Sequence, residues 1–281
     1  MNHPTIVVIV QARMSSSRFP GKVLKPLLGK PLLARMLERL NQCQTPFTTV
    51  VATSTDPSDD VIEQFCESEQ IPVYRGSLTD CLDRHYQIAI HWNADVAVKI
   101  PSDCPLIDPR VVDQVFDVFL KNPGQYDFVS NLHPATWPDG NDVEIMTRAC
   151  LQRTWSEATK PLEREHTTPY IWDTAPESFR IGNVVWPTGL DYSMSHRFTI
   201  DYADDYEFIR RIYEALYPAK PNFSCEDILN LLEQNPNIYE INADLAGVNW
   251  YRNHLNELKT VSAEQTKSPL PPKGAFNLAN A

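Results

Sequence analysis

The feature that most constrains this chain is the apolar strand at its start, together with the basic loop directly behind it. Residues 6–10 read Ile-Val-Val-Ile-Val, and such an apolar run predicts a strand buried on both faces of a parallel sheet. The loop that follows carries Arg13, Arg18 and Lys22 among small hydroxyl side chains. Because ligands of open α/β sheets bind where strands end, we expect this loop to bind a polyanion such as a nucleotide triphosphate.

Strand and helix patterns then alternate along the first half of the chain. Strands are expected at residues 6–10, 48–53, 71–74 and 94–100, and helices at 31–42, from 56 onward, at 79–92 and after Asp108-Pro109. This alternation predicts an α/β fold with a mostly parallel, doubly wound sheet.

The pattern loosens in the second half. Residues 133–197 are interpreted as a small antiparallel insertion at a subunit interface, with short strands at 142–146 and 179–185 and a helix near 148–158. A strand at 197–200 and helices at 203–216 and 224–234 restore the α/β pattern. We therefore expect a single domain over residues 1–261, followed by a disordered polar tail over 262–281.

Composition excludes several classes of protein. The net charge of -11 argues against nucleic acid or an anionic membrane as the main partner. The six cysteines form no CxxC pair, so buried thiols in a reducing cytoplasm are expected rather than a zinc site or a disulfide scaffold. No signal peptide and no apolar run long enough to span a membrane are recognisable.

The residues of the basic loop suit phosphate binding. Arginine side chains match phosphate oxygens, and Ser16 and Gly21 let the backbone approach and donate N–H groups. The G-x-x-x-x-G-K-[ST] pattern of a P-loop is absent. The alternative is a solvated loop whose basic residues pair with acids elsewhere.

Two aspartates follow predicted strands and are candidate ligands of a metal ion. Asp103 comes after the strand at 94–100, and Asp201 after the strand at 197–200. Two carboxylates at neighbouring strand ends can share one Mg²⁺, which prefers oxygen ligands together with phosphate and water. The alternative is that each aspartate caps the helix that follows it.

Several motifs together resemble the sugar cytidylyltransferases. The opening motif is Ala12-Arg13-x-x-Ser16-x-Arg18-x-Pro20-Gly21-Lys22. Further matches are Arg75-Gly76-Ser77-x-x-Asp80-x-Leu82-x-Arg84-His85-Tyr86, Asp103-Cys104-Pro105-Leu106-Ile107-Asp108, Gly140-Asn141-Asp142-Val143-Glu144 and Arg164-Glu165-His166-Thr167-Thr168-Pro169-Tyr170. These are most similar to the branch named for spore coat polysaccharide biosynthesis protein F.

The resemblance implies a nucleotide-diphospho-sugar transferase fold of GT-A type and a Mg²⁺-dependent reaction. CTP and a sugar acid would give a CMP-sugar and pyrophosphate, for polysaccharide or glycoconjugate biosynthesis. By resemblance, Arg13, Ser16, Arg18 and Lys22 would hold the triphosphate, with Arg13, Lys22 and Asp103 catalytic and with Asp103 and Asp201 as metal ligands. A homodimer is expected. Pro101 stands where the octulosonate synthetases have Gln, which leaves the acceptor open.

Other polar residues are open to two interpretations. Arg75, placed after a strand, could reach the nucleotide or an acceptor carboxylate, or pair with Asp80. His166 could act as a base near the acceptor, although a bracing role is favoured. Asp142 and Glu144 could bind acceptor hydroxyls or a second Mg²⁺, although an ordinary exposed strand face is favoured.

Two other functions remain open at this point. A GT-A-like glycosyltransferase would consume a nucleotide sugar, but such enzymes usually carry an Asp-x-Asp metal motif and Asp103 has no such partner. A non-catalytic module would bind nucleotide without turnover.

Overall fold

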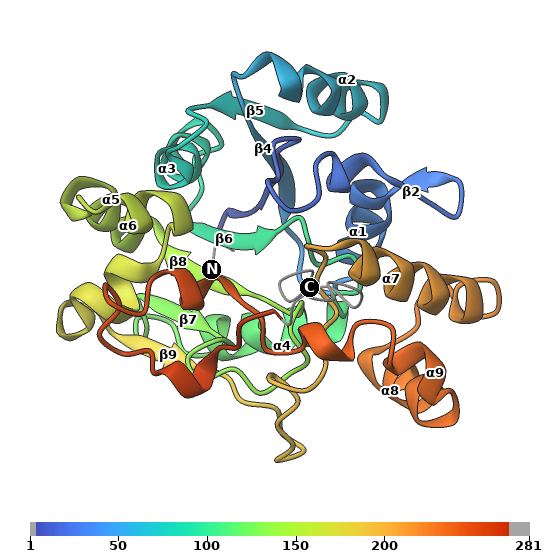
Figure 1. The fold of residues 1–281 in the computed structure, drawn as a ribbon. Coiled ribbons are helices and arrows are strands. Elements are labelled where there is room, and N and C mark those ends of the chain that lie inside the picture. Colours follow the sequence, from blue (N-terminus) through green and yellow to red (C-terminus); the bar gives the residue numbers. More distant parts are fainter. Residues whose placement is uncertain (1–3, 270–281) are drawn as a thin grey trace, which may run out of the picture.

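The computed structural model of the protein describes residues 4–269. Its centre is a seven-stranded sheet in the order β5-β4-β1-β6-β8-β7-β9, with helices packed on both faces (Figure 1). The strands are β1 (Ile6–Gln11), β4 (Thr48–Ser54), β5 (Val73–Gly76), β6 (Val96–Pro101), β7 (Phe128–Ser130), β8 (Glu144–Thr147) and β9 (Ile181–Asn183). The pairs β1–β4, β1–β6, β4–β5 and β7–β9 are parallel. The expected mostly parallel α/β fold is confirmed.

Most of the helices fall close to predicted ranges, but those at Pro161–His166 and Pro236–Tyr239 were not predicted. They are α1 (Leu32–Leu40), α2 (Asp60–Ser68), α3 (Cys81–His91), α4 (Pro109–Leu120), α5 (Arg148–Glu157), α6 (Pro161–His166), α7 (Ala203–Leu216), α8 (Cys225–Gln234) and α9 (Pro236–Tyr239). A two-stranded hairpin, β2 (Pro26–Leu27) with β3 (Lys30–Pro31), precedes α1. No helix among residues 4–269 is long and apolar enough to cross a bilayer.

The apolar run of β1 is explained by burial on both of its faces. Val8 and Val10 belong to a core cluster with side chains of α1, α4 and α7. Val7 and Ile9 point the other way and pack with side chains of α3 and α5. Successive strand residues alternate between faces, so a strand covered on both sides needs apolar residues at every position.

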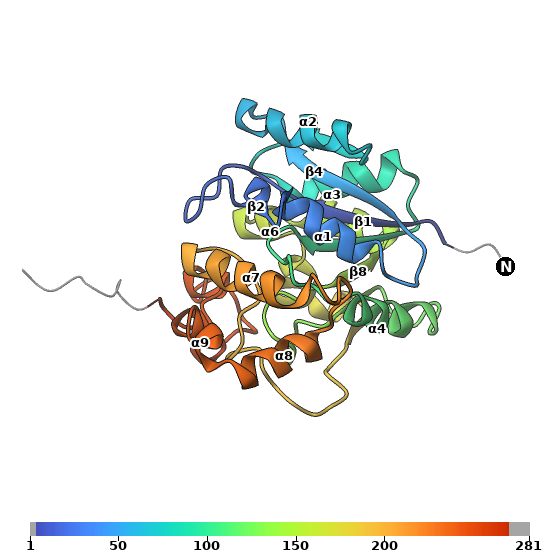
Figure 2. The same cartoon turned by 90° about the vertical axis from the view of Figure 1, so that its right-hand side faces the viewer.

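The order of the strands reverses between β1 and β6. The chain runs from β1 outward through β4 to β5, and then returns to place β6 on the other side of β1. Such a switch point opens a crevice beyond the carboxyl ends of the two strands. In Figure 2 the blue loop after β1 and the red C-terminal segment both lie on the left of the molecule, opposite the N-terminus.

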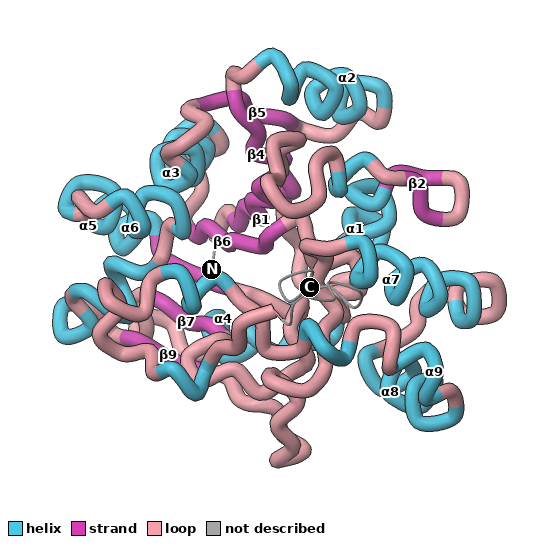
Figure 3. Tube along the Cα trace, viewed as in Figure 1, coloured by secondary structure: helices cyan, strands magenta, loops and turns pink. Residues whose placement is uncertain are grey.

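The region over residues 133–197 contains the predicted strands, β8 and β9, and the predicted helix, α5, but only one of the two strands is antiparallel. Only β8 pairs antiparallel within the seven-stranded sheet, to β6 and to β7, and β9 runs parallel to β7. Most of the region is helix and loop, including α5, α6 and a π-helical turn at Tyr170–Thr174 (Figure 3). β7 lies before the predicted insertion and was not expected, because a three-residue strand gives little pattern.

Two further expectations differ from the structure. Residues 197–200 form no strand; Arg197 makes one isolated bridge to Asp139. Within the predicted tail, residues 263–265 form a short 3₁₀ helix, and the Lys267 N–H donates to Gly247 O at 2.8 Å. The rest of that tail, 270–281, lies outside the described residues. The six cysteines are free, five of them buried, as predicted.

Gly140 permits a close contact that positions the segment leading to Asp201. It has a φ of +108°, and a Cβ atom there would lie 2.7 Å from the carbonyl carbon of Phe198 and 2.8 Å from the backbone nitrogen of Thr199. Gly189 has a φ of +77° but nothing within 4 Å of its would-be Cβ. Both positions have a positive φ, but only at Gly140 would a Cβ atom clash with neighbouring atoms. Comparing alanine variants at the two positions therefore distinguishes the cost of backbone strain from the cost of the clash.

We predict that Gly140→Ala lowers the free energy of unfolding by more than about 3 kcal/mol, and Gly189→Ala by about 1 kcal/mol. Both variants carry the cost of a left-handed backbone, but only the first must displace backbone atoms. Urea denaturation of both variants and the wild type checks this. Equal losses would show that the close approach is unimportant.

Candidate active site

A cavity of about 400 Å³ opens beyond the carboxyl ends of β1 and β6. This is the switch point of the sheet, and the volume lies within the range usual for small-molecule sites. Gln11 and Ala12 from the end of β1, and Ser102 and Asp103 from the end of β6, are among its lining residues. The cavity is therefore where the sequence led us to expect a ligand.

Lys22 brings the basic loop and the two aspartates together. Its Nζ donates to Asp103 Oδ2 at 3.0 Å, to Asp201 Oδ1 at 2.9 Å and to Ile200 O at 2.6 Å. Burial alone would lower the pKa of Lys22, but the charges of Asp103 and Asp201 outweigh it and raise that pKa above its usual value. The lysine is thus charged and fixed within the site.

Asp201 is surrounded by cations. Besides Lys22, Arg18 Nη2 lies 2.6 Å from its Oδ1 and Arg197 Nη2 lies 3.0 Å from its Oδ2. Burial alone would raise the pKa of Asp201, but Lys22, Arg18 and Arg197 hold it well below its usual range. Both oxygens of this carboxylate are therefore engaged by the chain's own cations.

Asp201 lies beside Asp103 although no strand precedes it. The Ile200 N–H donates to Asp103 O at 2.9 Å, and Thr199 Oγ1 donates to the same oxygen at 3.0 Å. These two bonds fasten residues 199–201 to the end of β6. The predicted neighbourhood of the two aspartates is present, but a loop produces it.

The basic loop is anchored by a hydrogen bond to the buried Asp59. The Met14 N–H donates to Asp59 Oδ1 at 2.7 Å, and Ser16 N and Gly21 N both donate to Met14 O at 2.9 Å. Asp59 is fully buried. These bonds fold the loop back over the strand end, so that Arg13, Ser16, Ser17 and Arg18 line the cavity.

Arg13 and Arg75 differ in their place relative to the cavity. Arg13 is half-exposed at its rim, 3.5 Å from Glu165. Arg75 lies outside the lining residues and forms ion pairs with Asp60 and Glu63, each at 2.6 Å. The structure does not bring Arg75 to the other predicted site residues, because β5 is two strands away from β1. The ion pair considered between Arg75 and Asp80 is also not formed, because Asp60 and Glu63 are the partners of Arg75.

Lys99, which the sequence did not single out, joins Glu144 and Thr168 in a buried polar group. Lys99 on β6 is in register with Glu144 on β8 and forms an ion pair with it. Thr168 Oγ1 donates to the other Glu144 oxygen at 2.5 Å. Burial would lower the pKa of Lys99, but Glu144 raises it. The feature of the sequence that could have indicated this group is Lys99 itself, a lysine inside an otherwise apolar strand.

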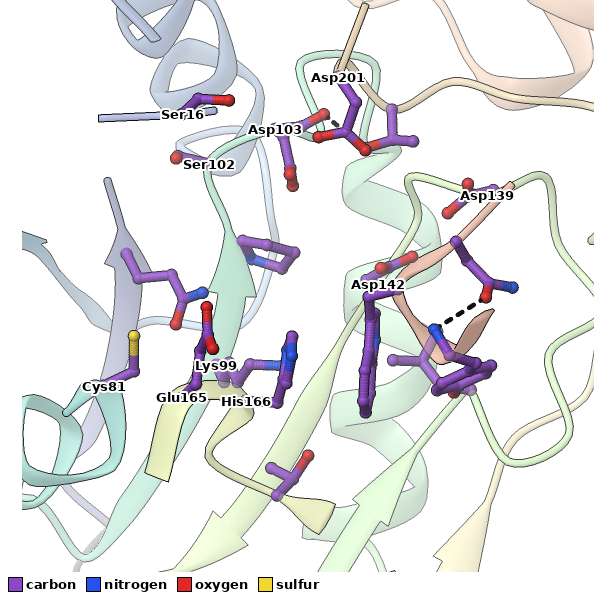
Figure 4. A pocket seen from close by; sticks show the side chains of 18 of the residues that line it. Ser16, Cys81, Lys99, Ser102, Asp103, Asp139, Asp142, Glu165, His166 and Asp201 are labelled. Atoms are coloured by element: carbon purple, nitrogen blue, oxygen red, sulfur yellow. Dashed lines mark hydrogen bonds between the residues drawn. The ribbon is translucent and has the colours of Figure 1, made fainter. Parts of the chain in front are cut away.

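The predicted exposed face at residues 142 and 144 is wrong. Glu144 has a side chain that is only 2% exposed, and both Asp142 and Glu144 line the cavity. Burial, and then the charge of Asp103, raises the pKa of Asp142 to about 6. Asp139 also lines the cavity, and burial raises its pKa well above the usual value. Four aspartates thus gather at this site (Figure 4).

His166 and His133 also line the cavity and stack on tryptophans. The ring centroids of His166 and Trp250 are 3.8 Å apart and their planes meet at 14°. The ring centroids of His133 and Trp172 are 4.0 Å apart and their planes meet at 25°. Burial lowers the pKa of His166 to about 3 and that of His133 to about 4. Both rings are neutral near pH 7. The bracing role favoured for His166 fits its stack, yet the ring also faces the cavity.

The arrangement of this cavity agrees with a comparison of the whole sequence. The family model described as Cytidylyltransferase matches residues 7–245. The chain belongs to the cytidylyltransferase family. The match spans the sheet, the basic loop and all four aspartates of the site.

Relatives of this family member support the assignment. Spore coat polysaccharide biosynthesis protein SpsF of Bacillus subtilis is 30% identical over 236 residues, which cover 82% of this chain and 95% of that protein. A 3-deoxy-manno-octulosonate cytidylyltransferase of Trichlorobacter lovleyi is 38% identical over 119 residues, covering 42% and 46% of the two chains. A solved cytidylyltransferase structure from Leptospira borgpetersenii shares 34% identity with a TM-score of 0.78, covering 84% and 97%. The fold is that of the nucleotide-diphospho-sugar transferases.

The acids of the site fit a magnesium ion in their chemistry. Mg²⁺ is commonly held by one or two carboxylates, completed by substrate phosphates and water. Asp103 faces the cavity with a side chain that is 29% exposed. Within residues 4–269 no three His, Cys, Asp or Glu side chains converge as a ready-made metal cage. The phosphates of a substrate would therefore have to supply part of the coordination.

The raised pKa of Asp142 gives the folded protein a measurable pH dependence. An unfolded aspartate has a pKa of about 3.9, so between pH 4 and 6 the folded state binds more protons than the unfolded state. Stability contributed by this group therefore increases as the pH falls from 7 to about 4.

We predict that Asp142→Asn raises the free energy of unfolding at pH 7 by on the order of 1–3 kcal/mol, and that this gain disappears by about pH 4. Chemical denaturation with EDTA present, from pH 4 to 7.5, measures it. Asp117→Asn, at an exposed position in α4, is the control and should parallel the wild type. A constant gain at all pH values would contradict the assignment.

Proposed function

We propose that the protein transfers CMP from CTP to a sugar acid of the 2-keto-3-deoxy type, releasing pyrophosphate and forming a CMP-sugar for polysaccharide or glycoconjugate biosynthesis. Family membership and the names of the relatives support the reaction. The observation that carries it is the cavity in which Arg18 and Lys22 meet Asp103 and Asp201. Such a combination suits a nucleotide triphosphate with its divalent ion.

The basic residues would bind and orient the triphosphate. Arg13, Ser16, Arg18 and Lys22 lie on one loop, so they can engage consecutive phosphates while the loop stays anchored through Asp59. An acceptor oxygen attacks the α-phosphorus, and the bond to pyrophosphate breaks. Lys22 and Arg18 would offset the charge that develops on the leaving pyrophosphate. The protein's contribution is positioning and charge stabilisation.

The acids would serve the metal. We propose Asp103 and Asp201 as ligands of Mg²⁺, which when bound neutralises phosphate charge and lowers the pKa of an acceptor hydroxyl. For Asp201 this requires an exchange of partners, because Arg18 and Lys22 share its Oδ1. A triphosphate that attracts these two cations would release that oxygen.

A cytoplasmic location and a homodimer complete the proposal. The six free cysteines support a reducing compartment. The dimer stays a prediction, and light scattering coupled to size exclusion tests it.

We predict that Lys22→Ala and Asp103→Ala each lower the rate of pyrophosphate release by about 10²–10³-fold. The assay combines CTP, Mg²⁺ and a panel of keto-deoxy sugar acids, with ATP, GTP and UTP as competitors for the nucleotide site. Each variant removes a charge that the transition state needs, and circular dichroism checks that the fold persists.

Lys25→Ala is the matched control for Lys22→Ala. Lys25 ends the same short helical turn, packs over the Phe19 ring at 4.6 Å and is not a lining residue. It should keep wild-type turnover. Undiminished rates in Lys22→Ala or Asp103→Ala, or nucleoside diphosphate in place of pyrophosphate, would refute the proposal.

A further inference from the structure

The cavity has two chemically different ends. One end, here called the basic end, contains Lys22, which forms ion pairs with Asp103 and Asp201, and Arg18, which forms an ion pair with Asp201. The other, here called the aromatic end, is lined by imidazole, indole and amide groups: His133, His166, Trp172, Asn249, Trp250, Asn253 and His254. Two ion pairs, Arg13 with Glu165 and Lys99 with Glu144, also lie at this end. Figure 4 shows Asp103 and Asp201 apart from His166, which lies beside Lys99 and Glu165.

One wall of the aromatic end comes from a segment beyond the family match. Residues 248–254, here called the C-terminal wall, contribute Val248, Asn249, Trp250, Tyr251, Asn253 and His254 to the cavity lining. The match to the family model ends at residue 245. The shared family sequence therefore supplies the basic end, and a segment outside it helps to enclose the rest.

The C-terminal wall is held in place on both sides. At its first residue, Arg197 Nη1 donates to Val248 O at 2.7 Å within the buried network around Asp201. After it, the buried Asp173 accepts through Oδ1 from Lys259 N and Thr260 N, each at 2.7 Å. Hydrogen bonds to buried charged groups are strong. The wall therefore has a defined position over the cavity.

Ring stacking joins this wall to the rest of the aromatic end. Trp250 stacks on His166, which ends α6, at 3.8 Å, and Tyr251 meets Trp172 edge to face at 6.1 Å. Aromatic rings offer rigid surfaces that bind apolar C–H faces, while neutral imidazoles and amides exchange hydrogen bonds with hydroxyl groups. A sugar ring presents both kinds of surface.

We propose that the C-terminal wall forms part of the acceptor-sugar subsite and determines which sugar is accepted, with Trp250 as its main contact. The inference rests on the proposed function, since it names the half of that site which binds the acceptor. The triphosphate occupies the basic end, so the acceptor must approach from the aromatic end to reach the α-phosphorus. Specificity is then set by a segment that lies beyond the residues matched by the family model.

Steady-state kinetics of the full chain test this with CTP, Mg²⁺ and two probe acceptors, 3-deoxy-manno-octulosonate and N-acetylneuraminate. Trp250→Ala should raise the KM of the acceptor about tenfold, leave the KM of CTP within about twofold, and change the ratio of kcat/KM between the two sugars. Trp250→Phe keeps a ring and should recover most of the loss. Pyrophosphate release is the readout.

Trp155→Ala is the matched control. Trp155 stacks on Tyr86 at 4.2 Å with planes at 15°, much as Trp250 stacks on His166, but it lies outside the cavity lining. Its loss should leave the acceptor KM unchanged. If Trp250→Ala does not fold, Asn253→Ala at an exposed position of the same wall should still raise the acceptor KM about threefold.

The outcomes separate the two proposals. An unchanged acceptor KM in Trp250→Ala and Asn253→Ala, or a rise confined to the KM of CTP, overturns the subsite and leaves the proposed function standing. Failure of the wild type to release pyrophosphate with any nucleotide and either sugar overturns the proposed function for these acceptors, and the subsite with it.

Discussion

The ammonium group of Lys22, placed between Asp103 and Asp201, is the interaction around which the site is built. Carboxylates gathered in a partly buried place repel one another, and only nearby cations make such a cluster tolerable. Lys22, Arg18 and Arg197 do this here. Such a balance changes when a ligand arrives, because an added polyanion competes for the cations and an added metal ion competes for the acids. The ion pairs within this site can therefore be exchanged for contacts with a substrate that brings both an anionic phosphate chain and a metal cation.

Arg197 extends this network beyond the cavity. Its guanidinium is almost fully buried and contacts Asp139, Asp201 and Asp205, and it also donates to Val248 O. Arginine is suited to this role because its planar fork holds several acceptors at fixed angles and remains charged when buried. One side chain thus fixes the acid at the basic end and the start of the C-terminal wall together. The two ends of the cavity are mechanically connected through it.

How much of this could be predicted from the sequence depended on the pattern behind each residue. The basic loop and Asp103 follow long apolar strands, so their places at one sheet edge could be expected. Asp201 was correctly expected beside Asp103, but the strand that was expected to place it there is absent. Two hydrogen bonds to Asp103 O hold the preceding loop residues in position instead. Arg75 was also expected after a strand, but it lies within β5, two strands away from β1. Glu144 was assigned to an exposed face, because its partner Lys99 is distant in sequence and the pairing of β8 with β6 could not be known. The C-terminal wall has no periodicity at all.

The contribution of residues 248–254 to the cavity has a consequence for any shortened version of the chain. The sheet, the basic loop and the acids all precede residue 206, and α7 and α8, which pack in the core beside the sheet, end at residues 216 and 234. A chain cut after α8 would therefore keep the residues of the charged crevice but lack the segment that lines the cavity beyond them. Enclosure of the cavity depends on residues outside the strands of the sheet.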